Sequence, residues 1–171
     1  MRYSFRKASI ILALIAVLPG AALAATYYHR VFDTKRGGSV CYSRVYSDAF
    51  LKKNPNVKLT TLSLERRSSV SDSVPNSKKR FGITFGATTK SEDYSANADC
   101  RPQGSVISCD VESDGGKFTI MRSGKGVIIK TRRIEIEGFF KDLDISSKKG
   151  KSTRSFTLKG NGKETCAAAF D

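Results

Sequence analysis

Apolar and polar residues alternate with a period of two over much of the chain, a pattern typical of β-strands with one buried face. Val57 and Leu59 alternate with polar neighbours, and the apolar positions then shift to Leu62 and Leu64. A shift of this kind inside one strand indicates a β-bulge, here near Thr60–Thr61.

The alternation continues towards the C-terminus. Phe81, Ile83 and Phe85 alternate with residues that include Gly82 and Gly86, and two glycines on one face indicate a bend or close packing. A second change of parity predicts a bulge at Arg132–Arg133. The remaining alternating segments predict strands over 94–100, 106–112, 117–122, 127–137, 142–145 and 155–159.

Three segments lack this pattern. Ser47 to Lys53 predicts a short helix, with Ser47 as its cap and Pro55 beyond its end. The Ser-rich segment 67–79 is expected to be an exposed, mobile loop, and 25–38 a polar N-terminal arm. Short strands with Gly-rich turns favour an all-β protein, a single antiparallel β-sandwich or small barrel of about eight strands over 39–171, with one short N-terminal helix.

The first 24 residues have the pattern of a signal peptide. Arg2, Arg6 and Lys7 precede an uncharged apolar run over 8–18, and Ala22-Leu23-Ala24 matches a signal-peptidase site. We expect cleavage between Ala24 and Ala25 and a protein of the periplasm or a secreted one. No second long apolar run follows, so no transmembrane segment is expected after cleavage.

Four cysteines follow the predicted cleavage site, and an even number in an exported chain indicates disulfides. The pairing Cys100–Cys109 with Cys41–Cys166 is favoured, because a predicted turn at 101–104 lets the first pair face across a hairpin. Zinc sites use closely spaced cysteine pairs with histidine, whereas this chain has no such spacing and only His29. No metal and no cofactor are therefore expected.

Charge is the main clue to partners. Without its first 24 residues the chain has 27 basic and 16 acidic side chains, a net charge of +11. Such an excess favours anionic partners or simple solubility. The segment 91–116 is different, with six acidic residues and only Arg101 as a basic one.

The expected anion-binding residues come from two basic clusters. The main one is Lys148, Lys149, Lys151 and Arg154, and the second, which would add to it, is Arg132 and Arg133. Solvated surface charge is the alternative for each cluster, and only convergence on one face would separate the two. Nucleic acid is not expected as a partner, because an exported protein rarely meets it and no aromatic residue lies between Phe140 and Phe156, around the most basic loop.

Two further site hypotheses start from acidic residues. Asp110, Glu112 and Asp114 resemble the start of a calcium loop, but the twelfth position is Met121 rather than glutamate, which favours a hairpin turn at 114–116. Asp99 with Asp110 could form a catalytic carboxylate pair, although surface acids explain both residues more simply. With one histidine and paired cysteines, we do not expect an enzyme.

Two short motifs, Cys41-Tyr42-Ser43-Arg44-Val45-Tyr46 and, after Cys109, Asp114-Gly115-Gly116-Lys117-Phe118, resemble those of a group of small exported proteins of alphaproteobacteria. The resemblance implies bacterial export and supplies no site, since the group has no established activity. The sequence thus predicts a non-catalytic binding protein for an anionic envelope component, a lipid head group or other polyanion. The alternative is a protein-interaction module, an inhibitor or assembly factor, that uses a strand edge or the acidic 91–116 region.

Overall fold

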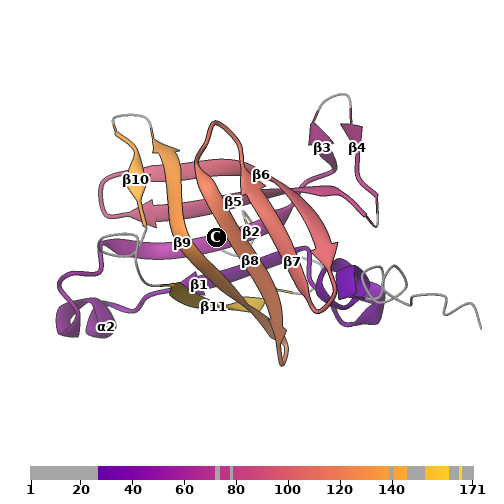
Figure 1. Cartoon of the computed structure of the whole chain (residues 1–171). Helices are drawn as coiled ribbons and strands as arrows, with labels where there is room; N and C mark the ends of the chain where they lie inside the picture. Colours follow the sequence, from indigo (N-terminus) through magenta and orange to yellow (C-terminus); the bar gives the residue numbers. More distant parts are fainter. Residues whose placement is uncertain are drawn as a thin grey trace, which may run out of the picture.

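The computed structural model describes residues 27–71, 74–77, 79–138, 141–145, 153–161 and 166 (Figure 1). The predicted signal peptide lies outside the described residues. A helical segment over 27–32 precedes the other elements, which are η1 (Thr34–Arg36), β1 (Cys41–Val45), α2 (Asp48–Lys53), β2 (Leu59–Arg66), β3 (Ser69–Ser71), β4 (Val74–Pro75), β5 (Phe81–Thr89), β6 (Asp93–Gln103), β7 (Val106–Val111), β8 (Gly116–Ser123), β9 (Gly126–Gly138), β10 (Leu143–Asp144) and β11 (Arg154–Gly160).

Eight antiparallel strands close into a barrel. Their order is β1-β2-β5-β6-β7-β8-β9-β11, and β11 pairs back with β1. The order of these strands around the barrel is therefore the same as their order along the chain. The predicted all-β class is confirmed. Of the two architectures that the sequence favoured, a β-sandwich and a small barrel, the structure is the barrel. The two-residue strand β10 is added outside this ring, where it pairs with the far part of β9.

Both predicted bulges are present. The pairing of β2 with β5 shifts between Leu59 and Thr61. The pairing of β8 with β9 shifts between Lys117, opposite Arg133, and Phe118, opposite Thr131, which leaves Arg132 as the extra residue. The extra residue at each bulge shifts the alternation by one position. Apolar side chains on both sides of the bulge can therefore point into the core.

Apolar side chains form one continuous core. Those that are completely buried include Leu62, Leu64, Phe81, Ile83, Phe85, Ile107, Ile120, Ile129 and Ile134. A barrel of eight strands is just wide enough for side chains to fill it. The barrel is thus a packed body, and the hollows described below lie on its surface.

The segment predicted as an arm, 25–38, instead contributes to the core where the structure describes it. Residues 27–32 are helical, and Tyr28, Val31 and Phe32 are buried against the barrel. Arg122 of β8 holds this segment, since its Nη1 donates to the carbonyl of Arg30 and its Nη2 to that of Gly37 at 2.7 Å. The sequence did not predict this helix, because the three residues Tyr28, Val31 and Phe32 among many polar ones gave too weak a periodic signal.

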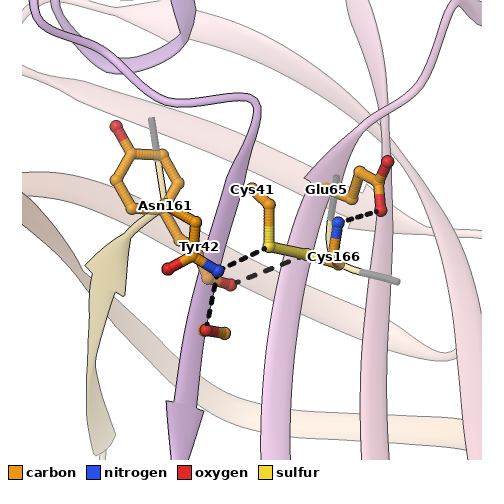
Figure 2. Close-up of a disulfide and its surroundings, with 6 residues drawn as sticks. Cys41, Tyr42, Glu65, Asn161 and Cys166 are labelled. Carbon is orange, nitrogen blue, oxygen red and sulfur yellow. Dashed lines mark hydrogen bonds between the residues drawn. A yellow bond between two sulfur atoms is a disulfide. The ribbon is translucent and has the colours of Figure 1, made fainter. Parts of the chain in front are cut away.

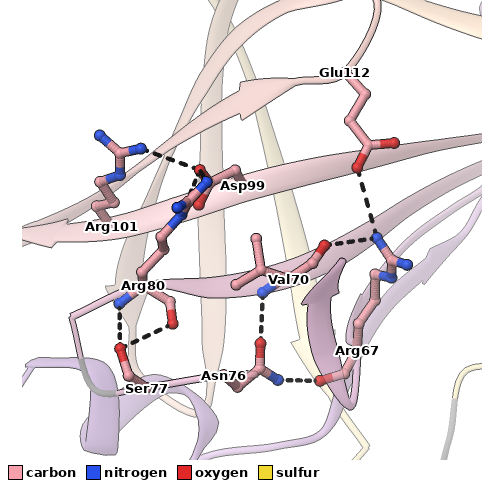
Figure 3. Close-up of polar contacts among 9 residues, drawn as sticks. Arg67, Val70, Asn76, Ser77, Arg80, Asp99, Arg101 and Glu112 are labelled. Carbon is pink, nitrogen blue, oxygen red and sulfur yellow. Dashed lines mark hydrogen bonds and ion pairs between the residues drawn. The ribbon is translucent and has the colours of Figure 1, made fainter. Parts of the chain in front are cut away.

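The segment predicted as a mobile loop, 67–79, contains the hairpin β3–β4. Val70 is only 4% exposed, and the Asn76 side chain joins the hairpin to β5 (Figure 3). Its Nδ2 donates to the carbonyl of Arg67 at 2.5 Å, and its Oδ1 accepts from the N–H of Gly82 at 2.8 Å. A Cβ on Gly82 would overlap the carbonyl oxygen of Ser69, which confirms the predicted close packing at this glycine.

The two predicted disulfides are confirmed. Cys100 and Cys109 are direct partners in the pairing of β6 with β7. Cys41 on β1 is bonded to Cys166, whose N–H donates to Glu65 Oε2 at 2.9 Å (Figure 2). This second bridge ties the start of the barrel to a residue beyond its last strand.

Candidate functional site

Two surface grooves meet at the end of the barrel that carries α2. Figure 1 shows α2 and β10 at this end, on the left, while helix 27–32 and the β3–β4 hairpin lie at the other. The grooves have volumes of about 720 and 630 Å³, and Val57, Lys58 and Leu143 line both. These three residues form a shared ridge, so the grooves belong to one surface, which we call the α2 end.

Helix α2 contributes side chains to both grooves. The Ser47 hydroxyl accepts from the N–H of Phe50 at 3.3 Å, which caps the helix as the sequence predicts. Along α2, Leu51 lines the larger groove and Phe50 the smaller one. One short helix therefore contributes an apolar wall to both grooves.

The larger groove combines an apolar lining with four lysines, and we call it the lysine groove. Its apolar side chains include Leu51, Pro55, Val57 and Leu143, and its charged ones are Lys52, Lys58, Lys90, Lys141 and Asp48. The four lysines are exposed, and none makes an ion pair within the described part of the chain. Each ammonium group is available to an anion that lies over the apolar lining.

The smaller groove, which we call the arginine groove, is lined by two arginines, and Arg44 lies over aromatic rings. Its basic lining residues are Arg44, Arg154 and Lys58, and its acidic one is Asp144. Its apolar side chains are Tyr46, Phe50, Val57, Leu59, Leu143, Ile145 and Phe156. The Nη1 of Arg154 donates to the carbonyl of Ile145 at 3.2 Å, which fixes that side chain beside β10.

Arg44 is held by ring contacts. Its guanidinium carbon lies 4.5 Å from the centroid of the Tyr46 ring and 5.9 Å from that of Phe50. The two rings are themselves 5.3 Å apart. Burial raises the pKa of the Tyr46 hydroxyl, while nearby Arg44 lowers it. A guanidinium group stacked on an aromatic face keeps the N–H edge of its plane free for a carboxylate or phosphate group.

The expected anion-binding residues fall in different places. Arg154 lines the arginine groove. Arg132 lies exposed at the β9 bulge. Arg133 lines a separate pocket, where it donates a hydrogen bond to Glu135 at 3.0 Å. This hydrogen bond raises the pKa of Arg133. Lys148, Lys149 and Lys151 lie outside the described residues. The structure thus brings Arg154 together with Arg44 and Lys58, and places Arg133 elsewhere.

Sequence reasoning missed the residues that share the grooves with Arg154. Arg44, Lys58, Lys90 and Lys141 come from four separate segments, and each looks like an ordinary surface charge in isolation. One signal was available, because Arg44 lies two residues before Tyr46 and six before Phe50. Aromatic residues close to an arginine can stack on it.

Both acidic residues considered for catalysis, Asp99 and Asp110, form ion pairs with basic side chains. Asp110 lies 2.6 Å from Lys117, and Asp99 accepts from Arg80 at 2.8 Å and Arg101 at 3.1 Å (Figure 3). Ser113 and Asp114 have φ of 54° and 58°, in the turn that joins β7 to β8. The predicted hairpin turn is confirmed.

A pocket of about 310 Å³ gathers four acidic side chains, Glu112, Asp114, Glu135 and Asp142, around Arg133. Arg67 lies 3.7 Å from Glu112 and partly neutralises it (Figure 3). Among the residues that the structure describes, no group of three or more His, Cys, Asp or Glu side chains is arranged to hold a metal ion.

Comparison with family models, with curated proteins and with solved structures finds no match for this chain. Over the described ranges, no helix has the length and apolar character needed to cross a membrane.

Proposed function

We propose that the protein is a non-catalytic binding protein of the bacterial envelope that recognises an anionic lipid at the α2 end. One observation carries this proposal. Two adjoining grooves have apolar linings. Within the described part of the chain they also have six cationic side chains, Arg44, Lys52, Lys58, Lys90, Lys141 and Arg154, and two acidic ones, Asp48 and Asp144.

An amphiphile satisfies both parts of this surface. Its anionic head neutralises cations on the rim, and its chains cover apolar surface that is otherwise wet. A purely polar polyanion would satisfy only the cations. Groove volumes of 720 and 630 Å³ are in the range of ligand sites, roughly 300–1,000 Å³.

The proposed location in the periplasm, or outside the cell, follows from the signal-peptide pattern and agrees with the cysteines. All four are paired in two disulfides, and disulfides persist in oxidising compartments.

Vesicle binding tests the proposal. We expect the protein to sediment with phosphatidylglycerol vesicles and not with phosphatidylcholine vesicles, and to be released as salt rises. The variant Lys58→Glu/Lys90→Glu should lose at least tenfold in affinity. Its matched control is Lys125→Glu/Lys159→Glu, which makes the same charge change at exposed positions that line neither groove. Equal binding to both vesicles, or equal losses in both variants, would overturn the proposal.

The alternative is a protein-interaction module, for which the acidic pocket around Arg133 is the supporting observation. A strand edge gives it little support, because each of the eight barrel strands is paired on both sides. Crosslinking in cells separates the two functions. One recurrent protein partner, crosslinked through positions such as Glu112 or Asp114, would favour the module.

A further inference from the structure

Arg44 has hydrogen-bonding capacity that the protein does not use. Its side chain is half-buried, and within the described residues it forms ring contacts but neither a hydrogen bond nor an ion pair. A guanidinium group has five N–H donors. Those of Arg44 are open to solvent, because among the described residues Arg44 contributes none of the buried polar atoms that lack a partner, so an anion can reach them. The arrangement is that of a binding group prepared for an anion.

The charge of the arginine groove indicates which anion. Among the described residues that line it, Arg44, Lys58 and Arg154 carry three positive charges, and Asp144 carries one negative charge. The excess of two positive charges matches a phosphate monoester, which carries about −1.5 to −2 at pH 7. A phosphodiester or a carboxylate carries a single negative charge and would leave the groove positive.

The shape of the α2 end indicates how the rest of the ligand lies. Phe50 and Phe156 line the arginine groove, and the ridge of Val57 and Leu143 continues into the lysine groove. A phosphate held at Arg44 would therefore lie beside apolar surface that runs across both grooves. An acyl chain attached to that phosphate can cover this surface, whereas free phosphate cannot.

Resting on the proposed function, we infer that the arginine groove selects lipids with a terminal phosphate monoester over lipids with a phosphodiester head group. Arg44 is the selecting residue, since its planar fork can bind two phosphate oxygens at once and a lysine ammonium group cannot.

Titration calorimetry with short-chain lipids below their micellar concentration tests this inference. We expect dihexanoyl phosphatidic acid to bind at least tenfold more tightly than dihexanoyl phosphatidylglycerol. Inorganic phosphate, which lacks the chains, should bind at least tenfold more weakly than the phosphatidic acid. Similar affinities for the two lipids, no binding of either, or equally tight binding of inorganic phosphate would overturn the inference.

Two arginine variants make the test specific. Arg44→Lys keeps the charge and should reduce the preference for phosphatidic acid to threefold or less. Arg101→Lys is the matched control, because Arg101 lies on β6 in contact with Asp99 and lines neither groove. It should keep the wild-type preference, and cooperative thermal unfolding of both variants shows that they are folded.

The outcomes also separate this inference from the proposed function. If Arg44→Lys keeps the full preference while Lys58→Glu/Lys90→Glu no longer binds phosphatidylglycerol vesicles, the inference is wrong and the lipid-binding function stands. If neither vesicles nor short-chain lipids bind to the wild-type protein, both are wrong.

Discussion

Cys166 is bonded to Cys41 across 125 residues of chain, whereas Cys100 and Cys109 are nine residues apart. In the chain-entropy view, closing the longer loop stabilises the fold by about 5 kcal/mol and the shorter by about 2.7 kcal/mol. We therefore expect Cys41→Ser/Cys166→Ser to lower the free energy of unfolding more than Cys100→Ser/Cys109→Ser does. Urea unfolding of both double variants measures this, and an equal or reversed order would contradict it.

The Tyr42 hydroxyl predicts a dependence of stability on alkaline pH. It donates to the carbonyl of Val31 and accepts from the N–H of Ser39 at 3.2 Å, and burial raises its pKa above the ordinary 10.0. The folded state thus keeps this proton at pH values where the unfolded state has lost it. Stability from this group is complete below about pH 10 and falls as the pH rises towards the higher pKa of the folded state.

Tyr42→Phe tests this assignment. At pH 7 the variant should be less stable by about 0.5–1.5 kcal/mol, because the Ser39 N–H and the Val31 carbonyl each lose their bond to the hydroxyl but keep the 2.9 Å hydrogen bond to each other. Between pH 10 and 11 its stability should fall less steeply than that of the wild type. Urea unfolding from pH 7 to 11 measures both effects, and parallel curves above pH 10 would assign the alkaline loss to other groups.

Gly82 and Gly86 on β5 differ in what a side chain would meet. A Cβ on Gly82 would overlap the backbone carbonyl of Ser69, and one on Gly86 would overlap the Ser63 hydroxyl. A hydroxyl can rotate away, whereas a carbonyl in the β3–β4 hairpin can move only with its chain. Gly82→Ala should cost about 1–3 kcal/mol and Gly86→Ala less, which thermal or urea unfolding can compare directly. The reverse order would contradict the packing seen around the hairpin.

Asn76 joins the hairpin to the barrel through two hydrogen bonds, to the carbonyl of Arg67 and the N–H of Gly82 (Figure 3). Asn76→Ala leaves both backbone groups without this partner, and we expect a loss of about 1–3 kcal/mol. Amide exchange should become faster at Gly82, while Cys100 on β6 keeps its protection in conditions where only local opening occurs. Unchanged exchange at Gly82 would show that the hairpin is held by other contacts.

Much of the barrel could be predicted because its strands have one buried face. Alternation locates β5 through β9 and β11, and the changes of parity locate bulges at Thr60 and Arg132. β1 was missed, because Cys41 and Tyr42 are adjacent and both buried, which breaks the alternation. The β3–β4 hairpin was missed because its main anchors are Val70 and the polar side chain of Asn76.

The grooves could not be predicted, because they depend on where separate segments meet. Arg44 ends up beside Arg154 only because β11 pairs with β1 and closes the barrel. The composition of each segment is ordinary, and the cationic surface appears only when the segments are assembled. Of the three described residues that were expected to bind anions, Arg132, Arg133 and Arg154, only Arg154 lies in this surface.

The closure of the barrel has a consequence for the order in which the chain can fold. β1 and β11 are the first and last strands of the ring, so the ring stays open until residues up to Gly160 are available. Until then Cys41 also lacks its partner Cys166, while Cys100 and Cys109 can already pair across their own hairpin. Early oxidation of the short hairpin removes the two wrong partners for Cys41. If it forms first in the oxidising compartment, the local disulfide would thereby protect the long-range one during folding, a kinetic role separate from its smaller contribution to stability.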